Sequence, residues 1–437
     1  MNLRDEVVEL LQELIRLDTV NPPGNETRAA ELLRSYLEHN GVACELYARE
    51  PERANLVARI PGTGNGPRLV LLSHTDTVLA DPDEWSVDPW SAEIRDGHIW
   101  GRGALDMKGQ VAASAVAIAS LAREGFEPAG DLIFAACADE EMGEGVQYGL
   151  QWLVEAHPEA VEAEYSVNEG AGDRLEIGGR VFYLCSTAEK MSSPFRLRVK
   201  GRSGHGSMPG IADNALVKAA KLIERLDEFR PTLQIGPELE AMLEAFLGTK
   251  PAPEDALKLA RQADPLAGEQ VEPLLSMTVS PTMISASDKR NVIPGVCDVI
   301  VDCRLLPGQS QDEARAELLA ALGDGDYEFE WTEGYGGTRS PLDTPLWDAV
   351  SSFVREAEPG AEAVPFCVPG FTDSHWMRTR FGTVAYGFFP LKMDPALAAR
   401  LIHSADERVA VDDLELGLNF LRHAAQRVGK TDTGERA

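Results

Sequence analysis

Residues 68–78 read RLVLLSHTDTV, an uninterrupted apolar run that leads directly into a histidine and an aspartate two positions apart. A run of this kind is typical of a strand that is buried on both faces of a sheet. Such strands normally end in turn residues, whereas here His74 and Asp76 follow at once. A lone His-x-Asp pair is most often a strand cap or a surface pair, so the rest of the chain decides whether a reactive site begins here.

Further apolar strands alternate with helical segments along the first part of the chain. The Ala/Val-rich segment GQVAASAVAIASLARE (109–124), for example, precedes the apolar run DLIFAACA (131–138). Repetition of strand and helix predicts an α/β fold with a mostly parallel sheet flanked by helices. The other elements expected in this part are helices at 3–17 and 27–39 and strands near 43–48 and 55–60.

The pattern changes from Phe195 onward and returns after Gly334. Between these points, shorter strands and helices predict a smaller α+β domain, in which residues 231–275 look like a helical insertion. The predicted boundaries are an α/β domain of residues 1–186 and 334–437, an interrupting α+β domain of residues 187–333, and a mobile tail at 430–437.

The charge and the cysteines restrict the partners and the location. The chain has 41 Lys and Arg against 71 Asp and Glu, a net charge of −30, which argues against a nucleic-acid partner. The acidic, amphipathic amino terminus lacks the regions of a signal peptide, and no apolar run approaches the roughly 20 residues that a membrane helix needs. The six cysteines contain no C-x-x-C pair, which favours reduced core residues and a cytoplasmic location.

Four more segments place acids or a histidine after apolar stretches or in glycine-rich turns. Because the loops at the carboxyl ends of parallel strands meet in one crevice, we expect these side chains to lie together. Each one alone has an ordinary interpretation, such as an acid that begins a helix or a structural histidine. Together, imidazoles and carboxylates in one crevice favour a divalent metal site. The segments are WGRGALDMKGQ with Asp106, CADEEMGEG with Asp139, Glu140 and Glu141, YSVNEGAG with Glu169, and LIHSADE with His403.

With these residues in place, the chain resembles the co-catalytic zinc amidohydrolases and carboxypeptidases. That family includes aminoacylase, carboxypeptidase G, acetylornithine deacetylase and succinyl-diaminopimelate desuccinylase. The motifs HTD, GRGALDMKG, DEEMGEG and HGSMP occur in the family's order, and the resemblance extends from DTVNPPGNE (18–26) to LIHSADERV (401–409). One departure is Leu79, where family members often carry proline; it lies past the expected ligands.

The resemblance implies two divalent metal ions, zinc by type, with cobalt or manganese compatible with the carboxylate-rich ligands. Two metals would polarise an amide carbonyl and acidify a water molecule, and an unligated acid would take the water's proton and pass it to the leaving amine. The implied roles are His74 and Glu169 on one metal, Glu141 and His403 on the other, Asp106 bridging both, Asp76 fixing the tautomer of His74, and Glu140 as the general base.

The smaller domain would supply substrate contacts. By resemblance, His205 in KGRSGHGSMPG stabilises the oxyanion, and Gly370 lets the main chain approach the substrate. Asn291 and Arg304 would grip a free carboxylate as a pair, which suits the planar fork of arginine, although a charge on a strand surface is the plain alternative for Arg304. Asp373 and His375 lie near Gly370 in the sequence and receive no role.

We therefore expect a metal-dependent amidohydrolase that acts on N-acyl amino acids or on peptides with a free C-terminal carboxylate. A zinc aminopeptidase is one alternative, but it would lack the inserted domain. A non-catalytic binding relative is another, but such proteins usually lose a ligand or the base. The smaller domain is then a lid or dimerisation domain. In dimeric relatives these domains pair edge to edge, so we expect a homodimer in which His205 acts across the interface, with strands near 195–200 and 299–304 at the edge.

Overall fold

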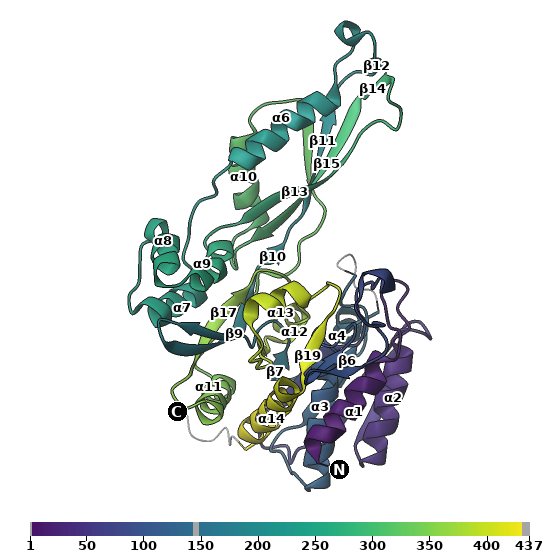
Figure 1. Cartoon of the computed structure of the whole chain (residues 1–437), viewed down its shortest axis with the longest axis vertical. Helices are drawn as coiled ribbons and strands as arrows, with labels where there is room; N and C mark the ends of the chain where they lie inside the picture. The colour runs from purple at the N-terminus through teal and green to yellow at the C-terminus, as the bar shows by residue number, and fades with distance from the viewer. Residues whose placement is uncertain (1, 143–147, 431–437) are drawn as a thin grey trace. The chain divides into compact units, whose positions relative to one another are not determined.

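The computed structural model describes residues 2–142 and 148–430, so nearly all of the expected tail and the end of the DEEMGEG motif lie outside the described residues. The chain forms two compact units (Figure 1). Unit 1 consists of Met1–Thr187, Ser340–Phe366 and Thr372–Ala437, and unit 2 consists of Ala188–Arg339 and Cys367–Phe371.

A nine-stranded sheet forms the centre of unit 1, with the strand order β1-β2-β6-β3-β7-β18-β9-β17 and β8 paired with β9. The apolar runs that predicted buried strands form β3 and β6, whose residues are all buried. The strands are β1 Ala43–Ala48, β2 Ala54–Ile60, β3 Leu69–His74, β6 Leu132–Cys137, β7 Tyr165–Asn168, β8 Arg174–Ile177, β9 Arg180–Glu189, β17 Glu362–Val368 and β18 Val384–Gly387.

The predicted α/β class is confirmed, and the parallel pairing is concentrated in the middle of the sheet. β6, β3, β7 and β18 are parallel neighbours, whereas β1–β2, β2–β6, β18–β9 and β8–β9 pair antiparallel. Strands such as β1 and β2 follow one another through short turns, and a short connection can join only antiparallel neighbours. The parallel strands are the ones that direct their carboxyl ends to a common edge.

Helices cover the sheet of unit 1. The Ala/Val-rich segment forms α3 (Lys108–Arg123), in which fourteen of sixteen residues are buried. α3 packs against α1 and α14, and the three lie side by side in Figure 1. The remaining helices and their bounds are α1 Leu3–Ile15, α2 Thr27–His39, α4 Leu150–Ala156, α5 Pro158–Val161, α11 Pro345–Ala357, α12 Ser374–Phe381, α13 Pro395–Leu401, α14 Val411–Val428 and the short 3₁₀ turn η1 Pro82–Glu84.

A small sheet in unit 1 joins two segments that are distant in sequence. Its strands are β4 (Ile94–Arg95), β5 (His98–Trp100) and β19 (Arg408–Ala410), in the order β19-β5-β4. β19 pairs antiparallel with β5, so the chain before α14 lies beside the chain that leads into the GRGALDMKG motif.

Unit 2 is an antiparallel sheet with two long helices packed on it. α6 and α10 share a hydrophobic core with the inward-facing residues of β11 and β15, whose burial alternates along each strand. The predicted helical insertion is confirmed as α7, α8 and α9. The elements are β10 Met191–Ser192, β11 Phe195–Lys200, β12 Gly204–His205, η2 Pro209–Ile211, α6 Ala215–Glu228, α7 Pro237–Leu247, α8 Pro253–Ala263, α9 Pro265–Val271, η3 Glu272–Leu274, β13 Thr278–Ser285, β14 Val292–Ile293, β15 Val296–Leu305, α10 Gln311–Leu322 and β16 Tyr327–Trp331.

The free edges of this sheet differ from the expected ones. The strands near 195–200 and 299–304 are interior, because β11 pairs with both β15 and β16 and β15 pairs with both β11 and β13. The edges are therefore β13 and β16. Met283 and Ile284 of β13 are 67% and 50% exposed, so the edge strand β13 carries an apolar surface.

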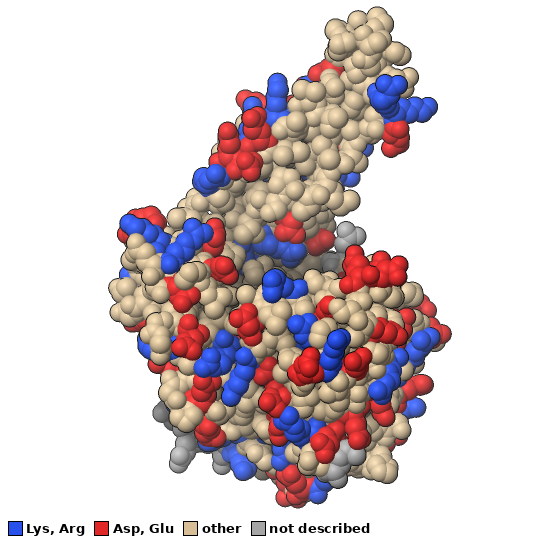
Figure 2. Space-filling model, in the orientation of Figure 1, with Lys and Arg blue, Asp and Glu red and all other residues tan. Residues whose placement is uncertain are grey.

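The charged side chains and the cysteines are arranged as the amino-acid composition led us to expect. On the face shown in Figure 2, Lys and Arg side chains are interspersed with Asp and Glu rather than gathered into one basic surface. None of the six cysteines forms a disulfide, and five of them are buried. Among the described residues, no helix is long and apolar enough to cross a membrane.

Candidate metal centre

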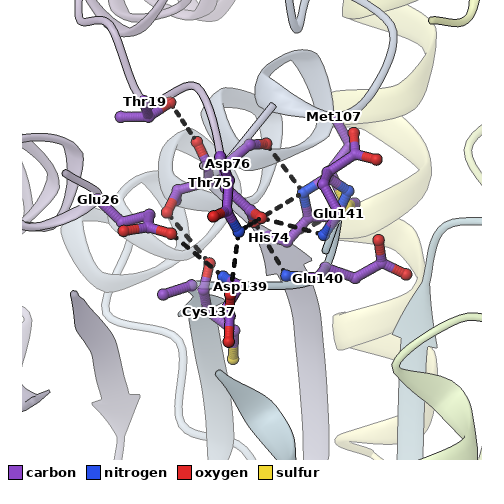
Figure 3. Close-up of polar contacts among 12 residues, drawn as sticks. Thr19, Glu26, His74, Thr75, Asp76, Met107, Cys137, Asp139, Glu140 and Glu141 are labelled. Carbon is purple, nitrogen blue, oxygen red and sulfur yellow. Dashed lines mark hydrogen bonds and ion pairs between the residues drawn. The ribbon is translucent and has the colours of Figure 1, made fainter. Parts of the chain in front are cut away.

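Three neighbouring parallel strands end at one edge of the unit 1 sheet and deliver a histidine and acids there. β3 ends at His74, which is paired in register with Cys137 at the end of β6. Glu140 and Glu141 follow β6 closely, and Glu169 follows β7 directly. Figure 3 shows His74, Glu140 and Glu141 gathered at this edge. The structure thus brings these segments together because their strands are parallel neighbours.

Asp106, in the turn before α3, lies between two histidines. Its Oδ1 is 3.1 Å from Nε2 of His74, and its Oδ2 is 3.1 Å from Nε2 of His403. Glu169 Oε1 lies 3.6 Å from the same nitrogen of His74, and Glu141 Oε2 lies 3.1 Å from that of His403. The candidate ligand atoms form two groups that share Asp106, and within each group they lie within 4.8 Å of one another.

This donor set fits two divalent cations. Glu141 Oε1 is buried and has no hydrogen-bond partner among the described residues, so it is a donor atom available to a metal. Burial and the charge of Asp106 raise the pKa of Glu141 to about 7, and burial and the charge of Glu169 raise the pKa of Glu140 well above its usual range. Hydrogen bonds to Asp106 and Glu141 raise the pKa of His403 to about 10. These shifts reflect a local excess of carboxylates, and an imidazole–carboxylate set of this kind suits zinc-like ions.

Asp76 is fully buried and connects the end of β3 to the loop after β6. Nδ1 of His74 lies 3.1 Å from the main-chain oxygen of Asp76 and 3.4 Å from its carboxylate. Both are acceptors, so Nδ1 donates its N–H on that side. Nε2 faces the carboxylates of Asp106 and Glu169, where the lone pair of a neutral ring would be available to a metal. The carboxylate of Asp76 also accepts the main-chain N–H groups of Glu140 and Glu141, at 3.2 and 3.0 Å. One buried acid therefore orients the histidine and holds the two adjacent glutamates.

A buried ion network behind Asp76 was not anticipated from the sequence. Arg53 contacts Glu26 at 2.6 Å and Asp139 at 2.8 Å, and Asn21 donates to Asp76 at 2.9 Å and to Asp139 at 3.0 Å. Figure 3 shows Glu26 and Asp139 close to Asp76. The signal for Asn21 and Glu26 was their position in the motif DTVNPPGNE, but a partner more than a hundred residues away is not readable from that motif.

Asp373 is a further acid of unit 1 whose environment stands out. It is 2% exposed, and neither carboxylate oxygen has a hydrogen-bond partner among the described residues. Burial, together with the negative charges of Glu169 and Asp76, raises the pKa of Asp373 to about 8. Its neighbour His375 lies in α12, where burial and the charge of Arg378 lower the pKa of the ring to about 4. Neither residue belongs to the two candidate ligand groups.

The unit 2 residues singled out in the sequence do not all lie together. His205 and Asn291 lie together, because β12 pairs with β14 and the N–H of Gly206 donates to the carbonyl of Asn291 at 2.7 Å. Nδ1 of His205 accepts the N–H of Ser207 at 3.2 Å, so the proton of the neutral ring is on Nε2. The exposed imidazole therefore presents an N–H donor to solvent.

Arg304 and Gly370 lie elsewhere in unit 2. Asn291 precedes β15, whereas Arg304 lies near the end of that ten-residue strand. At a strand rise of about 3.3 Å per residue, the two residues lie roughly 25 Å apart, so one chain does not bring the expected pair together. The guanidinium of Arg304 pairs through two hydrogen bonds, 3.0 and 2.8 Å long, with Asp302. At Gly370 an added Cβ would meet only Val368 Cγ1 at 3.8 Å, so no contact within the chain requires glycine there.

Comparison with known proteins places this site in a family. Residues 70–427 match the family model described as peptidase family M20/M25/M40. The chain is 28% identical to aminoacylase-1 of Sus scrofa over 414 residues, which cover 92% of this chain and 90% of that protein. It is also 28% identical to succinyl-diaminopimelate desuccinylase of Delftia acidovorans, with 96% and 97% covered.

Solved structures share the fold. An M20 family metallo-carboxypeptidase from Sulfolobus solfataricus superposes with a TM-score of 0.73 at 18% identity, with 98% of this chain and 100% of that chain covered. The YXEP protein of Bacillus subtilis, a dinuclear metal-binding peptidase from the M20 family, superposes with a TM-score of 0.63 at 14% identity, with 98% and 99% covered. The family match extends over most of the chain and includes every candidate metal ligand. The chain therefore belongs to peptidase family M20/M25/M40, a family of metallohydrolases that act on amide or peptide bonds.

Proposed function

We propose that this chain is a two-metal amidohydrolase that cleaves N-acyl amino acids or small peptides with a free C-terminal carboxylate. The observation that carries the proposal is Asp106, which offers one oxygen to each of two histidines, 3.1 Å away in both cases. A carboxylate in that position is suited to bridge two cations. We propose His74 and Glu169 as the remaining ligands of one metal and Glu141 and His403 as those of the other.

Two bound metals would polarise the scissile carbonyl and acidify a water molecule, and zinc is the metal that we propose, with cobalt and manganese as alternatives. Glu140 is outside both ligand groups, and its main chain is held by Asp76. A raised pKa suits this carboxylate to take a proton from water and return it to the leaving amine. The N–H on Nε2 of His205 is suited to donate to the oxyanion.

We propose that Arg304, Asn291 and Gly370 contact the substrate. Arg304 donates hydrogen bonds from Nε and Nη2 to the carboxylate of Asp302. A substrate carboxylate would therefore bind Nη1 or displace Asp302. The open space at Gly370 supports a close approach of the substrate to the main chain.

The two alternative functions are disfavoured. The presence of unit 2 argues against an aminopeptidase without an inserted domain, and the presence of each expected ligand and the base argues against a non-catalytic relative. Six unpaired cysteines support a cytoplasmic location.

The first prediction separates the base from the ligands. Glu140→Gln should retain both metals and lose about 10²–10⁴-fold or more in kcat, because an amide cannot take a proton. Metal content and hydrolysis of an N-acyl amino acid are measured on the same sample. Glu141→Gln is the matched control, and it should lose metal. The division of roles is wrong if Glu140→Gln keeps wild-type turnover or arrives without its metals.

The second prediction concerns the substrate carboxylate. Arg304→Ala should weaken the transition-state binding of N-acyl amino acids by about 2–5 kcal/mol, seen as a lower kcat/KM. Arg198, which lies on the same sheet beside Asp298, is the matched control, and Arg198→Ala should change kcat/KM by less than about 1 kcal/mol. Amides of the same amino acids should already be poor substrates of the wild type. Equal rates on the acid and the amide would contradict recognition of the free carboxylate by Arg304.

We further propose a homodimer in which His205 acts in the partner's site. His205 and Asn291 lie some 25 Å from Arg304 within one chain, which a site built from two chains would accommodate. The exposed β13 edge, with Met283 and Ile284, is an apolar surface on which a second copy can pair. The α7–α9 insertion is the alternative, because it would cap an edge and leave a monomer.

The third prediction tests the dimer by complementation. His205→Ala and Glu140→Gln chains are each expected to be inactive. After subunit exchange, a heterodimer should regain one complete site, formed by unit 1 of the His205→Ala chain and the histidine of the Glu140→Gln chain. Activity of the mixture is measured together with exchange of differently tagged subunits. Exchange without recovered activity would show that His205 works within its own chain or has no catalytic role.

A further inference from the structure

Glu407 is a fully buried carboxylate beside the candidate metal centre, and it belongs to neither ligand group. It lies four residues after His403, yet its partners come from the GRGALDMKG motif about three hundred residues earlier. Its Oε1 accepts the main-chain N–H groups of Leu105 and Asp106, at 2.7 and 3.0 Å. Its Oε2 accepts the N–H of Gly103 at 2.9 Å and a guanidinium N–H of Arg102 at 2.6 Å.

The contacts extend to the loop that follows Asp76. Arg102 donates its second terminal nitrogen to the carbonyl of Leu79 at 3.1 Å, and its guanidinium lies 5.3 Å from the ring centroid of Trp85. Glu407 thereby anchors, directly or through Arg102, three loops that border the metal centre. These are the loops after β3, before α3 and after α13.

The main chain of Glu407 reinforces the same connection. Its carbonyl accepts the N–H of Gly101 at 3.0 Å, and the next residue, Arg408, begins the strand β19 that pairs with Trp100 of β5. The segment that carries His403 is therefore attached to the segment that carries Asp106 by both side chain and backbone. The relative position of these two candidate ligands depends on that attachment.

We propose that Glu407 is a positioning residue for the metal centre, because it fixes the turn at Asp106 so that the two oxygens of that carboxylate face His74 and His403. The inference rests on the proposed function, in which Asp106 bridges two metals. A carboxylate that accepts hydrogen bonds from the main chain around a metal ligand restricts the orientation of that ligand, as a hydrogen bond to the ligand side chain does. Loss of such a restriction weakens metal binding.

Glu407→Gln tests this role sharply because all four partners are donors. In either orientation of the glutamine amide, its NH₂ group replaces one of the two carboxylate oxygens. The two N–H groups that donated to that oxygen then face another donor. The turn at Asp106 must then shift, while the side chain's volume stays nearly unchanged. Asp131→Asn is the matched control. The carboxylate of Asp131 likewise accepts a main-chain N–H, from Gly62 at 2.8 Å, and pairs with the guanidinium of Arg59. Asp131 precedes β6, so it lies at the end of that strand opposite to the site.

The fourth prediction is measured with Co²⁺ on the full chain. Dissociation constants come from competition with a chromophoric chelator, and the visible absorption of bound Co²⁺ reports its coordination. Glu407→Gln should bind Co²⁺ about 10–100-fold more weakly with an altered spectrum, whereas Asp131→Asn should keep wild-type affinity and spectrum. Thermal unfolding of the metal-free proteins shows how much each variant loses in general stability.

Two outcomes overturn the inference. Wild-type affinity and spectrum in Glu407→Gln would show that the contacts to Asp106 do not position it, and an equal loss in Asp131→Asn would show a general effect of destabilisation. If Glu407→Gln does not fold, Glu407→Asp, which retains the charge but shortens the reach, is measured against the same criteria. A wild-type chain that binds no Co²⁺ would instead contradict the proposed two-metal function itself.

Discussion

The collection of carboxylates at one buried edge of a sheet is the constraint on which the rest of this structure depends. His74, Glu140, Glu141 and Glu169 lie at the ends of parallel strands, and Asp106 before α3 and His403 after α13 join them there. Ionised groups removed from water are costly unless charges or hydrogen bonds compensate them, and the raised pKa values of Glu140 and Glu141 express that cost. Two divalent cations would compensate the buried negative charge, so the arrangement is suited to a metal centre.

The scaffold holds these groups mainly through main-chain N–H donors. Asp76 accepts two such donors from Glu140 and Glu141, and Glu407 accepts three from the turn at Asp106. Each of these anchors is a buried carboxylate that joins segments distant in sequence. A site held this way has its ligands oriented before a metal or a substrate arrives, and orientation in advance is what both metal affinity and catalysis require.

The sequence predicted the features that depend on local pattern. The apolar run before His74 identified a buried strand, and the strand–helix repetition identified the α/β class. The pairing of residues by function came from the family motifs, because spacing alone could not tell which acids meet. Glu407 and Arg53 were missed since their roles depend on partners far along the chain, such as Asp106 and Asp139.

The sheet edges of unit 2 show the same limit. Strand pairing is decided by long-range register, so β11 and β15 looked like edge strands and are interior. Asn291 and Arg304 looked like a pair because both matched family positions, yet the length of β15 separates them within one chain. The proposed homodimer, in which His205 acts across the interface, rests in part on that separation.

The central claim is that Asp106 bridges two metals. Anomalous diffraction from a crystal of the full chain grown with Zn²⁺ tests it directly. Two anomalous peaks about 3.5–4 Å apart are predicted, with Asp106 between them, His74 and Glu169 on one metal and Glu141 and His403 on the other. A single peak, or two peaks of which either lies away from Asp106, would contradict the account.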